Sequence, residues 1–179
     1  MDNQQPFTRS EIDDLRKLLE IEKIKALRLK YSYYMDSRQL DALAELFAED
    51  ALCEFGPYGN WSGVAAIANG FNTEFKDTLD QPFWSMHANT NHQISITGPD
   101  TAEGQIYLLD VVTDHKPDEN PFLWFAVYDE TYVKIDQVWK IQRTSIHFLW
   151  PQKHLDSSFI KRWIAAPYNA VNRFRAADF

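Results

Sequence analysis

The chain has little cysteine and little positive charge. Cys53 is the only cysteine among 179 residues, which excludes an internal disulfide and a cysteine-rich zinc site. Lys and Arg number 18 against 26 Asp and Glu, for a formal net charge of −8. Because nucleic-acid binding relies on clustered Lys and Arg, we expect no nucleic-acid partner. The cysteine content fits a reducing compartment, so we expect a cytoplasmic protein.

Long uncharged apolar runs are also missing. The opening MDNQQPFTRSEIDDL has neither the basic start nor the apolar core of a secretory signal, and no stretch is long enough for a membrane span. We therefore expect no export signal and no membrane partner. The length suits one domain over residues 1–179, with a core at about 15–150 and a helical extension at 151–179.

Aromatic residues, in contrast, are abundant. They make up 15% of the chain and include six Trp and twelve Phe, more than a core of this size needs. Such rings line ligand cavities or fill subunit interfaces. The composition therefore fits either a hydrophobic small-molecule partner or an aromatic subunit interface.

Two helices are expected in the first third of the chain. Apolar residues recur at three- and four-residue steps over about 10–35, and Ser10 followed by Asp13 suggests the helix start. Leu40, Leu43, Leu46 and Phe47 repeat the pattern, which predicts a second helix ending near 49–50. A third, short helix is expected in VAAIANGF, from Val64.

Four strand-like segments follow the helices. They are HANTNHQISITG, TAEGQIYLLDVVTD, FLWFAVYDETYVKID and VWKIQRTSIHFLW, separated by turns at 98–100, 116–121 and 136–137. Short connections between neighbouring strands predict a mainly antiparallel sheet. The fold class is therefore α+β, with N-terminal helices packed on a curved mixed sheet, and the apolar spacing in 155–164 predicts a terminal helix.

Two segments carry a resemblance to a known family. KYSYYMDSRQLDALAELFAEDA and SMHANTNHQISI resemble the entry and histidine segments of the SnoaL-like group in the nuclear transport factor 2 superfamily. That group includes scytalone dehydratase, hexachlorocyclohexane dehydrochlorinase and the bile acid 7α-dehydratases. The resemblance covers about residues 15–148 and implies a cone-shaped fold. It also implies catalytic roles for Tyr31, Asp36, His87 and Asp110.

The same resemblance extends to the last two strands. VYDETYVKIDQVWKIQR is similar to the closing strands of the family, which implies that Tyr128 and Glu130 face the cavity. The chain departs from scytalone dehydratase at Met35 and Ile106, where that enzyme has a tyrosine and a second histidine. It departs from the bile acid dehydratases at Phe148, where they have an arginine.

Two interpretations of Asp36 stay open at this point. In DSRQ the aspartate either caps the next helix or orients His87 as a general base. Tyr31 is either a hydrogen-bond donor to an oxyanion or, with Tyr34, a member of the apolar stripe. Five residues turn an ideal helix about 140° beyond a full circle, so Tyr31 and Asp36 share a face only if the helix bends or ends between them.

Further residues are candidates for the substrate-binding walls. Asp110 shares strand parity with Ile106 and Leu108, which places a carboxylate on an apolar face. His147, in the last strand, could reach the pocket. The wall candidates are Tyr34, Phe55, Trp84, Trp124, Phe125, Tyr128 and His147.

We expect neither a metal nor a bound cofactor. The chain has no GxGxxG or P-loop motif, and His87 and His92, five apart on a strand, face opposite sides. The resulting hypothesis is a cofactor-independent dehydratase. Two alternatives are an isomerase that shifts a double bond and a non-catalytic scaffold like the β subunits of aromatic-ring dioxygenases. The resemblance implies a homotrimer or homodimer.

Overall fold

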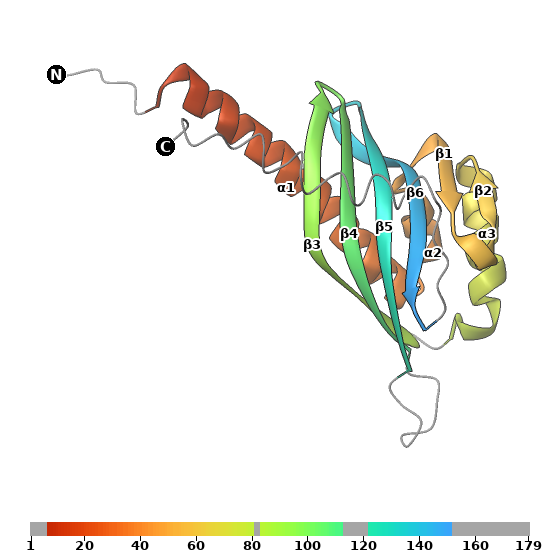
Figure 1. Cartoon of the computed structure of the whole chain (residues 1–179). Helices are drawn as coiled ribbons and strands as arrows, with labels where there is room; N and C mark the ends of the chain where they lie inside the picture. The colour runs from red at the N-terminus through yellow and green to blue at the C-terminus, as the bar shows by residue number, and fades with distance from the viewer. Residues whose placement is uncertain (1–6, 81–82, 113–121, 152–179) are drawn as a thin grey trace.

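The computed structural model describes residues 7–80, 83–112 and 122–151, in which helices pack on one face of a six-stranded sheet (Figure 1). The helices are α1 (Arg9–Asp36), α2 (Leu40–Ala44) and α3 (Val64–Phe75), with short 3₁₀ turns η1 (Gly56–Tyr58) and η2 (Lys76–Thr78). The strands are β1 (Phe47–Glu54), β2 (Asn60–Ser62), β3 (Ser85–Gly98), β4 (Thr101–Val112), β5 (Phe122–Ile135) and β6 (Val138–Trp150).

The sheet is mixed, mainly antiparallel and open. Its strand order is β2-β1-β6-β5-β4-β3, and β1 with β6 is the one parallel pair among the described strands. The long strands curve around α1, which crosses behind them in Figure 1. The predicted α+β class and the four predicted strands are confirmed.

The second helix is shorter than predicted. It ends at Ala44, and the residues from Phe47 onward form β1 instead of continuing the helix. The spacing of Leu43, Leu46 and Phe47 fits a helix. However, the backbone N–H of Ile141 in β6 donates to the Leu46 carbonyl at 2.9 Å and draws the chain into the sheet. Tertiary pairing thus overrides local periodicity. The predicted C-terminal helix falls on 152–179, outside the described residues.

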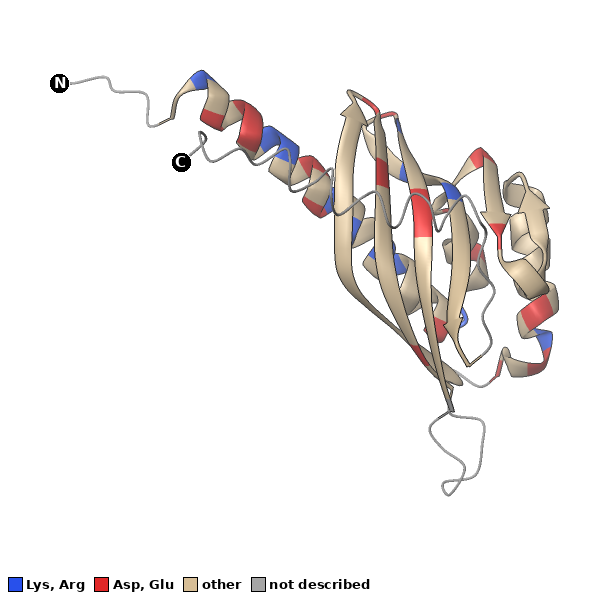
Figure 2. Ribbon diagram, in the orientation of Figure 1, with Lys and Arg blue, Asp and Glu red and all other residues tan. Residues whose placement is uncertain are grey.

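Helix α1 connects the surface to the core. It starts two residues earlier than predicted, with a capping box between Thr8 and Glu11 in place of Ser10 and Asp13. Figure 2 shows acidic and basic residues alternating along its outer, N-terminal part, where pairs such as Lys23–Glu20 form at (i, i+3). The buried stripe recurs every three or four residues and consists of Ile24, Leu27, Arg28, Tyr31, Ser32, Met35 and Asp36.

Candidate active site

A cavity of about 530 Å³ lies between the C-terminal end of α1, α3 and the inner face of the sheet. This volume suits a small organic ligand. Most of its lining side chains are aromatic or aliphatic: Tyr31, Met35, Phe55, Tyr58, Trp61, Phe71, Phe75, Trp84, Leu108, Val112, Trp124, Tyr128, Ile146 and Phe148. Polar lining comes from Glu74, Asp77, Thr78 and His87.

Helix α1 ends at this cavity through a Schellman turn. The backbone N–H of Gln39 donates to the Tyr34 carbonyl at 2.9 Å, and that of Arg38 to the Met35 carbonyl at 3.2 Å. Arg38 occupies the left-handed position, with φ of 59°, where glycine is usual. Asp36 is therefore the last helical residue, and its side chain is free to leave the apolar stripe.

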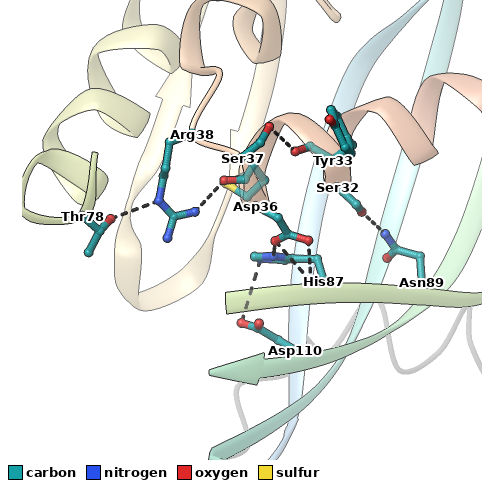
Figure 3. Close-up of polar contacts among 10 residues, drawn as sticks. Ser32, Tyr33, Asp36, Ser37, Arg38, Thr78, His87, Asn89 and Asp110 are labelled. Atoms are coloured by element: carbon teal, nitrogen blue, oxygen red, sulfur yellow. Dashed lines mark hydrogen bonds and ion pairs between the residues drawn. The ribbon is translucent and has the colours of Figure 1, made fainter. Parts of the chain in front are cut away.

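The side chain of Asp36 binds His87, as Figure 3 shows. Its Oδ1 lies 2.6 Å from His87 Nδ1, and its two oxygens accept the backbone N–H of His87 at 3.2 and 3.0 Å. Both side chains are about 90% buried. The start of α2 has no side-chain cap, and its N-cap residue is Gln39. Of the two interpretations of Asp36, the geometry favours orientation of the histidine.

Residues four apart on α1 contact residues two apart on β3, because the two spacings are nearly equal. One turn before Asp36, Ser32 accepts a hydrogen bond from Asn89, two residues after His87 (Figure 3). Four helical residues rise about 6 Å and two strand residues about 6.6 Å, so successive inward side chains stay in register. The second contact fixes the position of α1 along β3 and thus the approach of Asp36 to His87.

Asp110 faces the other side of the imidazole. It is the cross-strand partner of His87, and its Oδ2 lies 3.9 Å from His87 Nε2. Burial raises the pKa of Asp110, the positive charge of a protonated His87 opposes this shift, and the nearby Asp36 carboxylate adds to it. Its Oδ1 is buried and accepts no hydrogen bond from the described residues. A protonated or ligand-bound Asp110 would remove the cost of that isolation.

Tyr31 lies on the buried stripe of the same helix, more than one turn before Asp36, and lines the cavity. Its side chain is fully buried, and its hydroxyl has no partner in the described part of the chain. Burial raises the pKa of Tyr31 well above its usual value, so the phenol stays protonated and can donate. Because α1 ends at Asp36, the Asp36 side chain contacts His87 while Tyr31 lines the cavity. Of the four predicted catalytic residues, Tyr31 and His87 line the cavity, and Asp36 and Asp110 reach it only through their contacts with the His87 ring. Their roles remain predictions.

The predicted wall residues divide into two groups. Phe55, Trp84, Trp124 and Tyr128 line the cavity. The other three, Tyr34, Phe125 and His147, are not among its lining residues.

Strand parity explains two of the three exceptions. On β6 the inward positions are Thr144, Ile146 and Phe148, so the buried His147 points to the opposite face, where its ring lies 3.3 Å from Ser145 Oγ. Phe125 is on the outer face of β5, 41% exposed, and stacks on Trp150. Tyr34 is half-buried beside the core.

Sequence reasoning missed the wall formed by residues 58–75. Phe71 and Phe75 of α3 and Trp61 of β2 complete an aromatic enclosure with Phe55. A Cβ on Gly70 would stand 2.3 Å from the Trp61 ring, so only glycine lets the indole pack against α3. The glycine in VAAIANGF was the available signal, because a glycine inside a helical pattern indicates close approach.

Arg38 was also missed, because in the sequence it is an ordinary turn residue. Its guanidinium is buried, donating to Thr78 Oγ1 at 3.1 Å and to the Met35 carbonyl at 2.5 Å, and it lies over the Phe75 ring (Figure 3). The charges of Asp36 and Asp110 are close enough to counter the lowering of its pKa by burial. Arg38 therefore partly balances the two carboxylates.

Metal-binding clusters and membrane-spanning helices are both absent from the described residues. Within 7–80, 83–112 and 122–151, no three His, Cys, Asp or Glu side chains are arranged to hold a metal ion. None of the helices in those ranges has the length and apolarity needed to span a membrane.

Comparison with known structures identifies the fold. An NTF2-like protein with a cystatin-like fold from Novosphingobium aromaticivorans superposes with a TM-score of 0.71 at 18% identity, covering 88% of this chain and 97% of that one. A protein from the same organism, assigned as a scytalone dehydratase, gives 0.64 at 23% identity, covering 78% and 91%. A hexachlorocyclohexane dehydrochlorinase from Novosphingobium barchaimii gives 0.59 at 21%, covering 80% and 99%.

The sequence itself matches one domain family. The match to the SnoaL-like domain spans residues 16–145, from the middle of α1 into β6, and includes Tyr31, Asp36, His87 and Asp110. It confirms the resemblance predicted from the two sequence motifs. With the NTF2-like architecture, it establishes that the chain belongs to the SnoaL-like domain family.

Proposed function

We propose that the protein is a cofactor-independent lyase that removes water from a hydrophobic alcohol carrying an activating carbonyl group. The observation that supports this most directly is the 2.6 Å contact between Asp36 Oδ1 and His87 Nδ1 at the wall of an apolar cavity. The structural likeness to a protein assigned as a dehydratase and to a dehydrochlorinase points in the same direction, since both names describe elimination reactions.

His87 would act as the general base. With its Nδ1–H donated to Asp36, the ring keeps a lone pair on Nε2, the nitrogen nearer to Asp110. The carboxylate fixes the tautomer and stabilises the imidazolium that forms on proton transfer. Such a positioned base contributes about 10²- to 10⁴-fold to the rate.

Asp110 would act as the general acid toward the leaving hydroxyl. The C–H proton passes to His87 Nε2, the C–H electron pair becomes the new C=C bond, and the C–O bond breaks. Hydroxide leaves as water with the proton of Asp110, whose raised pKa favours the protonated form. The imidazolium then returns a proton to Asp110, 3.9 Å away, and both residues regain their starting states.

Tyr31 would stabilise the carbonyl oxygen as charge develops on it. Its unpartnered, buried hydroxyl lies in an aromatic enclosure where a hydrogen bond to an oxyanion is strong, because little water competes. Tyr128, on the facing strand, lines the same wall. The apolar lining is expected to select the carbon skeleton.

The charge of the cavity indicates a neutral substrate. Glu74 and Asp77 line it from the end of α3 and from η2, and no Lys or Arg of the described residues is among the lining side chains. A free carboxylate would meet repulsion from these residues. We therefore expect an uncharged polycyclic or terpenoid-like molecule. A homotrimer or homodimer and a cytoplasmic location remain predictions.

An isomerase that shifts a double bond is the second candidate. The same observation supports it, because proton abstraction beside a carbonyl starts both reactions and Asp110 can return the proton to a different carbon. Mass spectrometry separates the two, since dehydration removes one water from the mass and isomerisation leaves the mass unchanged. A non-catalytic scaffold is less favoured, because a scaffold has no need of a cavity lined by His87 and by the buried Tyr31 hydroxyl, which has no partner among the described residues.

His87→Ala tests the proposal. Neutral hydroxy-ketones of increasing ring number are incubated with the wild-type protein, and products are followed by absorbance of the conjugated double bond and by mass. We expect kcat to fall about 10²- to 10⁴-fold in the variant. Asp41→Asn, an exposed change in α2, is the control and should keep full activity. Full turnover by His87→Ala would refute the assignment.

A further inference from the structure

Behind the two tyrosines of the cavity lies a buried cation that the proposed chemistry does not use. Arg28 is 1% exposed, and its guanidinium carbon lies 3.9 Å from the ring centre of Tyr31 and 3.8 Å from that of Tyr128. Its own nitrogens make no hydrogen bond within the described residues. We propose that Arg28 is a positioning residue that orients and polarises both tyrosines for binding an oxyanion in the cavity.

A second polar network holds Arg28 in place. Its Nη1 lies 3.2 Å from Glu130 Oε1, and Glu130 is 2% exposed. Each carboxylate oxygen also accepts a hydroxyl, from Thr144 at 2.7 Å and from Tyr132 at 2.5 Å. His92 Nε2 lies 3.1 Å from the Tyr132 hydroxyl. These contacts fix the Glu130 carboxylate, and Glu130 in turn holds the Arg28 guanidinium over the rings of Tyr31 and Tyr128.

Stability alone does not account for this arrangement. A buried ion pair loses more hydration than its mutual attraction recovers unless further hydrogen bonds satisfy both partners. Both oxygens of Glu130 accept hydroxyl hydrogen bonds, whereas the Arg28 guanidinium has its ion pair with Glu130 but no hydrogen bond within the described residues. Apolar side chains of similar size in place of both charges often leave a protein no less stable. The position retains a cation instead, in contact with the two tyrosines that line the cavity.

The cation acts on the tyrosines in two ways. A guanidinium over the ring faces restricts their rotation, because it is attracted to both π systems at once. Its charge also favours negative charge on the phenol oxygen. Burial raises the pKa of Tyr128 to about 12, and Arg28 opposes that rise, as it does for Tyr31. A more acidic phenol is a stronger hydrogen-bond donor to a developing oxyanion.

The inference rests on the proposed function, and its test has one readout that does not depend on turnover. The variant is Arg28→Met/Glu130→Gln, which removes both charges and avoids an unpaired buried ion. ¹³C NMR of labelled tyrosine, assigned with Tyr31→Phe and Tyr128→Phe, reports the two hydroxyl-bearing carbons and the ring-flip rates. We expect both signals to shift and ring flips to accelerate in the double variant.

Turnover supplies the second readout. In the double variant we expect kcat to fall about three- to thirtyfold, which corresponds to the strength of a cation–π contact. KM should change less, because the lost interaction acts mainly in the transition state. Arg28→Lys keeps the charge and should recover part of kcat. The control, Lys30→Met, removes a charge from an exposed position on α1 and should leave both readouts unchanged.

The outcomes are distinguishable. Unchanged tyrosine signals overturn the inference, and so does a folded double variant with shifted signals but wild-type kcat. If the wild-type protein eliminates water from no substrate offered, the proposed function fails. The NMR arm then still decides whether Arg28 controls the two tyrosines, because it requires no substrate.

Discussion

Helix α1 meets the sheet at two ionic groups whose carboxylates differ in their hydrogen bonding. Near its C-terminus Asp36 binds His87 on the edge strand β3, and two turns earlier Arg28 pairs with Glu130 on β5. Within the described residues, both oxygens of Glu130 accept a hydroxyl, whereas Oδ1 of Asp110, beside the Asp36–His87 pair, accepts no hydrogen bond.

We interpret this difference in hydrogen bonding as a division between residues that stabilise the fold and residues that bind a ligand. A polar atom buried without a partner costs free energy, and a protein retains it where a bound molecule supplies the partner. Among the atoms without a partner in the described residues, Tyr31 Oη belongs to a residue that lines the cavity and Asp110 Oδ1 to one beside His87, whereas the satisfied carboxylate of Glu130 holds Arg28 behind the tyrosines. Four experiments test this division, in order of expected effect.

Asp36→Asn should give the largest effect on activity. The amide cannot stabilise an imidazolium, so we expect a loss of about 10²- to 10⁴-fold in kcat/KM with a small change in Tm. Steady-state kinetics and thermal melts measure the two quantities. A variant that loses stability in proportion to activity would assign Asp36 a structural role, like that of Glu130.

Glu130→Gln should give the opposite profile. It leaves Arg28 as an uncompensated buried charge, and we expect the free energy of unfolding to fall by about 3–5 kcal/mol. Chemical denaturation measures the loss. Adding Arg28→Met should restore most of it, because the unpaired charge is gone. If the single variant is as stable as wild type, the two groups do not differ in the way described.

Asp110→Asn should raise stability at neutral pH while lowering activity. The folded pKa of Asp110 lies above its usual value, so its contribution to stability is present at low pH and is lost as pH rises through the folded pKa. The advantage of Asn should therefore shrink toward pH 4. Melting temperatures across pH 4–8 provide the measurement, and a variant less stable than wild type at pH 7 would contradict it.

His92→Gln should give the smallest effect, visible only in acid. Burial lowers the pKa of His92 to about 4 from 6.5, so the folded state favours the neutral ring. Stability is present above pH 6.5 and is lost as pH falls toward 4. The Gln variant should lose less over that interval. An identical pH slope in both proteins would show that His92 does not titrate differently on unfolding.

Much of the site was predictable because its residues lie in short, recognisable segments. The aspartate at the end of the first helix and the histidine in SMHANTNHQISI were both named from the sequence. Their contact was less certain, because DSRQ also fits a helix cap. The failures share a cause: His147, Phe125 and the end of the second helix depended on strand pairing, which local periodicity does not encode.

The amino-acid sequence by itself indicated the fold class through its hydrophobic repeats. The family and the four candidate catalytic side chains came from the resemblance of local motifs to the SnoaL-like group. Only the tertiary structure decided which polar atoms are left without partners and which cation lies behind the tyrosines. Those facts depend on contacts between residues far apart in the chain, such as Arg28 with Glu130 and Asp36 with His87. Burial acts on such contacts through desolvation, which no single segment experiences before the chain has folded.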